Sequence, residues 1–241
     1  RKILFGWEAT VPGINGVEAI IFDLDGTLRH NRPTFLQGFQ DVAKRLAPPT
    51  SPSQWRTAVR WLHYYWAQSP DLARDRIRYA EQPEEFWRNH ARRQLLAFGI
   101  APAQADELAP EVQRYMAEEF LPENYVPPEV PESLSLLKSK GYHLSLLSNR
   151  STPCDEELQE IGLLQFFEFT LVAGQVDAWK PDRRIFQHAL ERTGSRPENT
   201  LYVGDNYFAD IIGSRRAGMR PVLLDPERIF FEADCTVIAS I

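Results

Sequence analysis

The sequence predicts an α/β protein with a parallel sheet and an all-helical segment inserted after the first strand. Two observations lead to this prediction. Short apolar runs alternate with helical stretches at the start of the chain and again beyond residue 121, which is typical of βαβ units. Residues 33–121, in contrast, contain no run that favours a strand. We therefore expect a discontinuous α/β core, residues 16–31 and 122–241, and a helical domain, residues 32–121.

The first strand is expected at residues 17–22, because the run VEAIIF is apolar and ends in β-branched and aromatic residues. Apolar runs of this length are typical of buried parallel strands. The insert that follows is predicted to form four helices, separated by clusters of proline, serine and glycine, at residues 33–46, 53–68, 83–98 and 102–120. Its aromatic side chains are interpreted mainly as its own core, namely Trp55, Trp61, Tyr65, Trp66, Phe86 and Trp87.

The second part of the core is predicted to alternate strands with helices. Further strands are expected at residues 144–147, 169–172, 201–203, 222–224 and 236–239. Helices are expected at residues 131–140 and 181–193, each of which begins with proline and is followed by glycine. Proline suits the first helical position, and glycine adopts the left-handed conformation that ends many helices.

Charge divides between the two predicted domains. Residues 32–121 carry 12 Lys or Arg and 11 Asp or Glu, a net charge of +1, and the remainder carries 15 and 22, a net charge of −7. Arg74, Arg76 and Arg78 stand at alternate positions of the insert. Two interpretations of this basic segment stay open: solvated helix and loop surfaces, or a lid that meets an anionic substrate.

The bulk composition narrows the class of protein. A net charge of −6 over 241 residues argues against a nucleic-acid-binding protein, and no apolar run reaches the roughly 20 residues of a membrane span. Cys154 and Cys235 lack the spacing of metal ligands, so we expect reduced thiols in a cytoplasmic protein rather than a disulfide. Residues 1–15 precede the first expected strand and form an N-terminal extension to which we assign no role.

Four short polar stretches stand at the carboxyl ends of predicted strands. They read "DLDGT" from Asp23, "LLSNR" from Leu146, "WKPD" from Trp179 and "VGDNYFAD" from Val203. Ligands of open α/β sheets bind at the carboxyl ends of the strands, so we expect these stretches to converge there. Side chains two apart on a strand point the same way, which would aim both aspartates of "DLDGT" at one site.

The residue types in these stretches suit phosphoryl transfer. Asp23 and Asp25 supply two carboxyls, one to attack and one to carry a proton. The Ser148 hydroxyl and the backbone N–H of Asn149 can donate to a phosphoryl oxygen. The alternative for Ser148 is a helix N-cap, and the two roles can coexist. Lys180 taken alone would be a solvated surface residue. Its place between the second and fourth stretches is what gives it significance.

The last stretch adds two more carboxylates, Asp205 and Asp210. A few hard oxygen ligands suit Mg²⁺, which keeps several waters. Asp23, Asp25, Asp205 and Asp210 together carry −4, and like charges about 4 Å apart repel by roughly 4 kcal/mol at an effective dielectric constant of 20. Lys180 and Mg²⁺ would bring +3 and leave −1. Such a cluster is hard to explain without a cation.

The four stretches, in this order, resemble the haloacid dehalogenase-like (HAD) superfamily. The resemblance is strongest to its Mg-dependent, phosphoglycolate phosphatase-like branch with an α-helical type-I cap, and it covers residues 17–238. It implies a Rossmann-like parallel-sheet core with an inserted helical cap. It also implies hydrolysis of a phosphomonoester. A small phosphorylated metabolite fits a helical lid better than a phosphoprotein does, because the lid limits access. Asn206 and Ser214 depart from the residues frequent in the family, but neither replaces a catalytic group.

The resemblance assigns a role to each site residue. Asp23 is the nucleophile that forms an aspartyl-phosphate. Asp25 is the acid and then the base, and its backbone carbonyl is a Mg²⁺ ligand. Ser148 binds the phosphate, and Lys180 holds the nucleophile and the phosphoryl group. The implied metal ligands are Asp23, Asp25, Asp205 and Asp210, the last of them either directly or through water.

Three alternatives are weighed against a phosphatase. A sugar-phosphate phosphomutase would share the site. A metal-independent 2-haloacid dehalogenase would leave Asp25, Asp205 and Asp210 without a role, because an expelled halide needs neither proton nor metal. A non-catalytic binding protein is disfavoured because every predicted catalytic position is filled.

Contacts to the leaving group are the least determined feature. Arg29, His30 and Arg32 follow the catalytic stretch, and we expect them either to contact substrate or to form a charged linker. Cap movement would hinge near residues 29–33 and 121–127. Both a monomer and a homodimer remain open.

Overall fold

The computed structural model describes residues 15–46 and 51–241 and divides the chain into two compact units. The boundaries fall between Arg29 and His30 and between Tyr125 and Val126. The expected boundaries at residues 31/32 and 121/122 lie inside or beside a two-stranded ribbon that belongs to the second unit. Residues 1–14 of the expected N-terminal extension lie outside the described residues.

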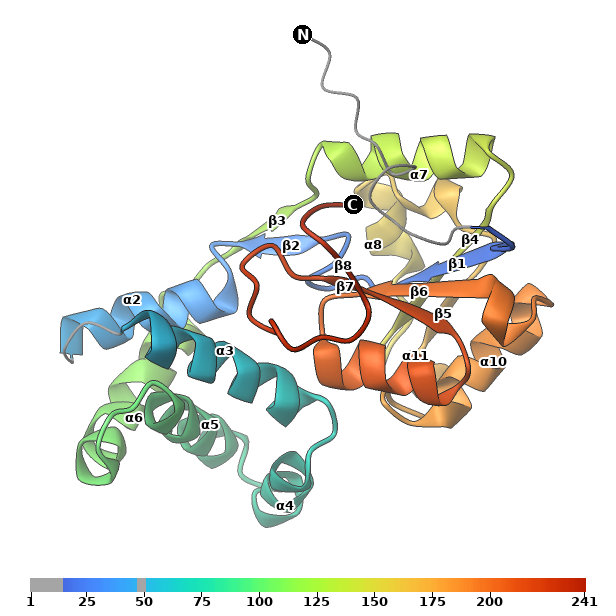
Figure 1. Ribbon diagram of the computed structural model, residues 1–241. Helices are drawn as coiled ribbons and strands as arrows, with labels where there is room; N and C mark the ends of the chain where they lie inside the picture. Colours follow the sequence, from blue (N-terminus) through green and yellow to red (C-terminus); the bar gives the residue numbers. More distant parts are fainter. Residues whose placement is uncertain (1–14, 47–50) are drawn as a thin grey trace, which may run out of the picture. The chain divides into compact units, whose positions relative to one another are not determined.

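The first unit is built on a six-stranded parallel sheet (Figure 1). Its strand order is β5-β4-β1-β6-β7-β8. The strands are β1 (Ala19–Phe22), β4 (His143–Ser148), β5 (Thr170–Val172), β6 (Thr200–Gly204), β7 (Arg220–Leu224) and β8 (Thr236–Ile238). All six expected strands are therefore confirmed, with small shifts at their ends.

The central strand β1 lies between β4 and β6. Ile21 pairs with Ser145 on one side and with Tyr202 on the other. This register brings the carboxyl ends of β1, β4 and β6 to the same edge of the sheet.

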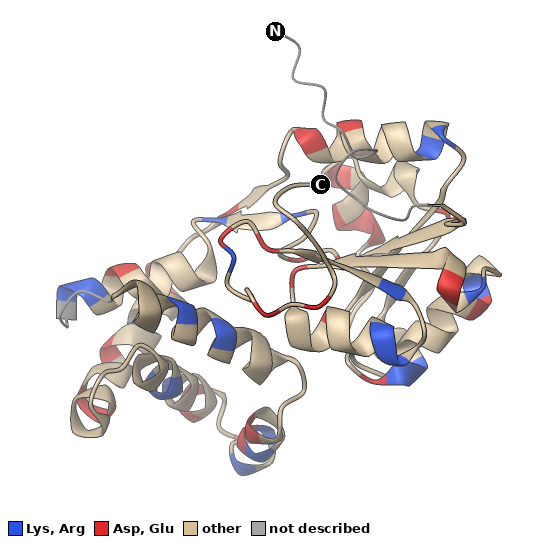
Figure 2. Cartoon of the chain, in the orientation of Figure 1, with Lys and Arg blue, Asp and Glu red and all other residues tan. Residues whose placement is uncertain are grey.

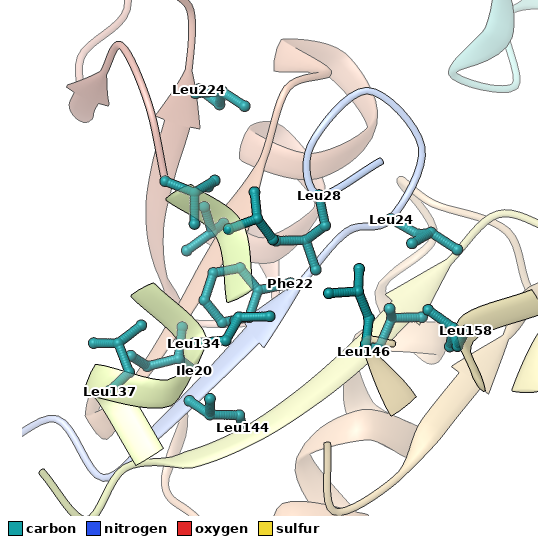
Figure 3. Packing of buried hydrophobic residues seen from close by; sticks show 14 of the residues in the cluster. Ile20, Phe22, Leu24, Leu28, Leu134, Leu137, Leu144, Leu146, Leu158 and Leu224 are labelled. Carbon is teal, nitrogen blue, oxygen red and sulfur yellow. The ribbon is translucent and has the colours of Figure 1, made fainter. Parts of the chain in front are cut away.

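Helices cover both faces of the sheet, as the alternation of side chains along a strand requires (Figure 1). Ile20 and Phe22 pack with leucines of α7 (Glu129–Ser139) and α8 (Asp155–Glu160) in one buried cluster (Figure 3). Ile21, between them, packs on the opposite face with residues of α10 (Arg183–Thr193). This three-layer arrangement anchors the strand end that carries "DLDGT".

Several helix ends differ from the expectation because capping side chains decide them. The expected start of α10 at residue 181 is wrong, since Asp182 accepts a hydrogen bond from Arg184 N and caps a helix that begins at Arg183. Helix α7 begins at Glu129 rather than at residue 131. The short helices α8 and α9 (Ala173–Val176) were not expected, and the π-helical turn η3 (Tyr207–Ile211) and α11 (Ile212–Arg216) follow β6.

The second unit contains a helical array and an antiparallel ribbon of β2 (His30–Arg32) and β3 (Glu123–Tyr125). Its helices are α2 (Phe35–Leu46), α3 (Pro52–Trp66), α4 (Pro70–Arg78), α5 (Pro83–Ala97) and α6 (Pro102–Glu118). The expectation of four helices is wrong, because α4 is a fifth. Ser69 accepts from Leu72 N and caps this helix, and Pro70 occupies its first turn.

Most of the aromatic residues of this unit pack within it, as expected. Tyr65 is fully buried, and Trp55 lies 6.3 Å from the Phe98 ring between centroids. Trp87 departs from this expectation at 49% exposed, and Phe35 and Tyr64 of the same unit are also exposed. The aromatic residues are therefore largely the core of the helical unit.

The charges of the helical unit are interspersed rather than gathered on one helix (Figure 2). The three arginines of α4 have partners inside their own unit. Arg74 pairs with Asp71, and Arg76 donates to Gln68 over 2.9 Å. Arg78 lies 5.4 Å from the Tyr79 ring centroid. These contacts favour the interpretation of a solvated, self-paired surface over that of an anion-binding run.

Two further expectations concern the whole chain. Cys154 and Cys235 are both free thiols. Across the described residues, no helix combines the length and the apolar character that crossing a bilayer requires.

Candidate active site

Asp23 directly follows β1 and is held at both carboxylate oxygens. Its N–H continues the ladder by donating to Val203 O over 2.9 Å. Lys180 Nζ donates to Oδ1 over 2.6 Å, and Thr27 Oγ1 donates to Oδ2 over 3.1 Å. The side chain is only 7% exposed. A buried carboxylate is therefore fixed in one orientation at the end of the central strand.

The turn after Asp23 joins the ends of β1 and β6. Gly26 has φ +90°, and a Cβ at this position would lie 2.8 Å from Asp205 Cγ. Only glycine fits both this backbone conformation and this approach. Thr27 Oγ1 accepts from Asp205 N over 3.1 Å, so its hydroxyl links the two stretches. Gly26 and Thr27, the "GT" of "DLDGT", thus set the distance between the carboxylates of Asp23 and Asp205.

Lys180 is the buried cation of the site. Its ammonium group donates to Asp23, to Asp210 Oδ1 over 2.7 Å and to the Tyr202 hydroxyl over 3.0 Å. Burial by itself would lower the pKa of Lys180, but Asp210 and Asp23 outweigh burial and raise it well above its ordinary value. The lysine therefore stays charged although its side chain is only 3% exposed. The third and fourth stretches therefore meet "DLDGT" as expected, although "WKPD" follows α9 and does not stand at the end of a strand as predicted.

Asn149 fixes the backbone that carries Lys180. Its Nδ2 donates to Lys180 O over 3.0 Å, and its Oδ1 accepts from Lys180 N over 2.7 Å. Ser148 is buried at the end of β4. The alternative explanation of Ser148 as a helix N-cap is wrong, because the next helix, α8, begins only at Asp155 and has Cys154 at its N-cap.

Three carboxylates converge beside Lys180. One oxygen each of Asp23, Asp205 and Asp210 lies within 4.8 Å of the others. Burial, together with the neighbouring carboxylates, raises the pKa of Asp23 to about 7 and that of Asp205 well above its ordinary value. If all three carboxylates are ionised, as in metal ligands, they and the lysine sum to −2. A divalent cation would cancel this charge, so the residues present fit a metal such as Mg²⁺.

Hydrogen bonds to both carboxylate oxygens fix the orientation of Asp210. Its Oδ2 accepts from Asn206 N over 2.9 Å, and its Oδ1 accepts from Lys180. Asn206 in turn caps η3 by accepting from Phe208 N and Ala209 N. Asp205 directly follows β6, and Asp210 lies within η3.

Asp25 turns to different partners. Its carboxylate accepts from Arg150 Nε over 2.7 Å and from Arg29 Nη1 over 3.0 Å, and it does not belong to the three-carboxylate cluster. Arg29, a candidate for substrate contact, thus donates a hydrogen bond to a predicted catalytic residue. His30 and Arg32, the other two candidates, lie on β2 in the second unit, where Arg32 stacks 4.3 Å from the Tyr125 ring centroid.

Sequence reasoning missed three residues of this site. Tyr202 lies in an apolar strand run, and Arg150 and Glu157 meet Asp25 and Arg29 only after folding. A signal existed for Tyr202, because alternation along β6 places it on the same face as Gly204, just before Asp205. No local signal pairs Arg150 with an aspartate 125 residues away.

Several characterised proteins that are similar to this chain in sequence are phosphatases. A glyceraldehyde 3-phosphate phosphatase of Methanothermobacter thermautotrophicus is 38% identical over 44% of this chain and 48% of its own length. A phosphoserine phosphatase of Thermus thermophilus is 39% identical over 48% and 49%. The chain thus aligns with about half the length of these two relatives. A ribulose-1,5-bisphosphate 5-phosphatase of Halopiger xanaduensis is 26% identical over 92% of this chain and 89% of its own.

Solved structures share the fold at lower identity. A dehalogenase covers 94% of both chains with a TM-score of 0.55 and 20% identity. A predicted phosphoglycolate phosphatase of Haemophilus somnus covers 88% of this chain and 86% of its own, with a TM-score of 0.52 and 21% identity. These likenesses establish the architecture of sheet and helices.

A family model completes the comparison. The model described as haloacid dehalogenase-like hydrolase matches residues 17–218, which include all four polar stretches. Because this match spans most of the chain and contains every residue of the site, the chain belongs to the haloacid dehalogenase-like hydrolase family.

Proposed function

We propose that this protein is a Mg-dependent phosphomonoester hydrolase that acts on a small phosphorylated metabolite through an aspartyl-phosphate on Asp23. The observation that carries the proposal is the position of Asp23. Its carboxylate lies against Lys180 and within 4.8 Å of two further carboxylates, while a second acid stands two residues away. This combination supplies a nucleophile, a cation, a metal site and a proton carrier.

In the first step, a carboxylate oxygen of Asp23 attacks the phosphorus of the substrate. A bond forms between Asp23 and phosphorus, and the bond from phosphorus to the leaving oxygen breaks. Asp25 gives its proton to that oxygen, so the substrate leaves as a neutral alcohol. Ser148 and the Asn149 N–H are suited to receive phosphoryl oxygens at the end of β4.

In the second step, water attacks the aspartyl-phosphate. Asp25 accepts a proton from the water, the water oxygen bonds to phosphorus, and the bond to Asp23 breaks. Inorganic phosphate leaves, and both aspartates return to their starting forms. One residue therefore serves as acid and then as base.

Lys180 and a bound metal ion would each neutralise part of the negative charge of the site. Lys180 neutralises part of the charge on Asp23 and Asp210, with which it forms buried hydrogen bonds. Asp23, Asp205, the Asp25 backbone carbonyl and Asp210, directly or through water, would hold Mg²⁺. When bound, the ion screens an anionic phosphate from the carboxylate that attacks it.

The same geometry argues against a haloacid dehalogenase. Expulsion of halide needs no proton and no metal, so Asp25 and the pair Asp205 and Asp210 would be idle. The curated relatives are named for phosphates of glyceraldehyde, serine and ribulose bisphosphate, all of them small. These names support a small phosphorylated metabolite as the substrate of this chain.

The test is a panel of phosphate esters and a 2-haloacid, assayed with Mg²⁺, with EDTA and with the Asp23→Asn variant. We expect release of inorganic phosphate from at least one ester with Mg²⁺ and none in the other two conditions. Release of halide without metal would replace the proposal with a dehalogenase. Conversion of a sugar phosphate to an isomer without release of phosphate would replace it with a mutase.

A further inference from the structure

The guanidinium group of Arg150 forms two hydrogen bonds with the carboxylate of Asp25. Arg150 Nε donates to Asp25 Oδ2 over 2.7 Å, and Arg150 Nη2 donates to Oδ1 over 2.8 Å. Two parallel hydrogen bonds of this kind fix both the position and the plane of a carboxylate. Arg29 Nη1 adds a third bond to Oδ1 over 3.0 Å.

Glu157 anchors the two arginines from the other side. Arg150 Nη1 pairs with Glu157 Oε2, and Arg29 Nε lies 3.3 Å from Glu157 Oε1. Glu157 belongs to α8, whose Leu158 is buried in the core against the sheet. The two arginines and two carboxylates balance in charge. The arginines that bind Asp25 are thus themselves bound to a residue of the buried helix α8.

The side chain of Asp25 has little else to hold it. Its backbone is fixed by the turn in which Gly26 N donates to Arg29 O over 2.8 Å. The carboxylate is 39% exposed, and within the described residues every hydrogen bond to it comes from Arg29 or Arg150. Asp23, in contrast, is buried and held by Lys180 and Thr27. Orientation of Asp25 therefore depends on the arginines.

Orientation matters for a proton acceptor. A base acts only within hydrogen-bond reach of the proton it takes, and a misplacement of about 1 Å costs on the order of 100-fold in rate. Both oxygens of Asp25 accept hydrogen bonds from Arg150, which is the arrangement of an acceptor rather than of a donor. This is the form that the second step of the proposed hydrolysis uses.

We propose that Arg150, anchored by Glu157, is a positioning residue that orients Asp25 for attack of water on the aspartyl-phosphate. The proposal rests on the proposed function, because it presupposes a phosphorylated Asp23 and a base at Asp25. In the step concerned, Asp25 takes a proton from water, the water oxygen bonds to phosphorus, and the bond from phosphorus to Asp23 breaks. Arg150 acts through Asp25, and none of its own bonds forms or breaks in this step.

The experiment separates the two chemical steps with p-nitrophenyl phosphate and Mg²⁺. p-Nitrophenolate leaves without a proton, so formation of the aspartyl-phosphate does not need Asp25. The ratio kcat/KM reports this formation, whereas kcat includes the attack of water. For Arg150→Gln we expect kcat to fall roughly tenfold to 100-fold. We expect kcat/KM to stay within about threefold, and the phosphorylated fraction of the enzyme in steady state to rise.

Glu157→Gln removes the partner of Arg150 and Arg29 without changing a contact of Asp25 itself. We therefore expect a smaller fall in kcat, again with kcat/KM nearly unchanged. Arg150→Lys keeps the charge but loses the paired geometry, and it should recover only part of kcat. Arg114→Gln is the matched control. Arg114 pairs with Glu111, Glu118 and Glu119 on the second unit, and its loss should leave both constants unchanged.

Three results would overturn the role of Arg150. The first is an equal fall in kcat and kcat/KM, which marks general damage. The second is an unchanged kcat. The third is a faster loss of the phosphoryl group, which would mean that the ion pair weakens Asp25 as a base more than it orients it. Asp25→Asn serves as the reference: if it does not accumulate phosphoenzyme, the proposed function fails rather than the role of Arg150.

Discussion

At the scale of single residues, the site depends on a buried lysine that must remain charged. Lys180 is the cation among Asp23, Asp205 and Asp210, and it forms hydrogen bonds with two of them. Removing one partner of a buried ion pair typically costs about 3–5 kcal/mol of stability. The same contacts give Asp23 its orientation. Stability and reactivity at this position therefore rest on the same atoms.

Gly26 gives a prediction at this scale, because it sets the approach of the turn to Asp205. In Gly26→Ala, the new Cβ must push the Asp205 carboxylate away, in addition to the strain of alanine at φ +90°. We expect the affinity for Mg²⁺ to fall by about tenfold or more, equivalent to about 1.4 kcal/mol. Calorimetric titration of the variant with Mg²⁺ measures this.

Gly141→Ala is the matched control for Gly26→Ala. Gly141 has φ +87°, and nothing lies within 4 Å of an added Cβ. It should therefore lose about 1 kcal/mol of stability through backbone strain alone and bind Mg²⁺ like the parent protein. Equal Mg²⁺ affinities for both variants would contradict the account of Asp205.

At the scale of elements, helix α5 carries a histidine that must be neutral in the folded state. His90 lies among aromatic rings of α3 and α5, with its ring centroid 5.2 Å from that of Tyr65 and 5.3 Å from that of Trp66. Burial, opposed by Asp75 and assisted by Arg93, lowers the pKa of His90 to about 4. Protonation of this residue therefore favours the unfolded helical unit.

The sign of the effect follows from linkage. The unfolded chain binds the proton near pH 6.5, whereas the folded chain binds it near pH 4, so stability is complete above pH 6.5 and falls as the pH drops toward 4. The expected loss is on the order of 3 kcal/mol. Urea unfolding of the helical unit, followed by tryptophan fluorescence between pH 4 and 7, measures it.

His90→Phe should flatten this pH dependence, because it removes the titrating group and keeps a ring among rings. His188→Phe, on the exposed side of α10, should leave the pH dependence as in the parent protein. A slope in His90→Phe equal to that of the parent would show that another group is responsible.

The elements also show what the sequence can predict of the fold. Six strands were found from short apolar runs, since a parallel strand buried on both faces leaves a local signal. Helix boundaries were less accurate because a single cap decides them. Asp182 is the N-cap of α10, which therefore begins at Arg183 and not at Pro181. Ser69, which was expected only to separate helices, is the N-cap of α4.

At the scale of the whole molecule, the candidate site could be predicted only in part. The four stretches were expected to meet because strand ends of a parallel sheet share one edge, and Asp23, Lys180, Asp205 and Asp210 do meet there. The hydrogen bonds from Arg150 to Asp25, and the ion pair of Arg150 with Glu157, depend on residues far apart in the chain, and neither residue type predicts them. Supporting contacts of this kind need three-dimensional packing.

The central claim is that Asp23 becomes phosphorylated during turnover. The most direct measurement uses the Asp25→Asn variant with Mg²⁺ and p-nitrophenyl phosphate, quenched in acid and digested, with the phosphoryl group located by peptide mass spectrometry. The account predicts a phosphoryl group on Asp23. A phosphoryl group on any other residue, or undiminished turnover by Asp23→Asn, would contradict it.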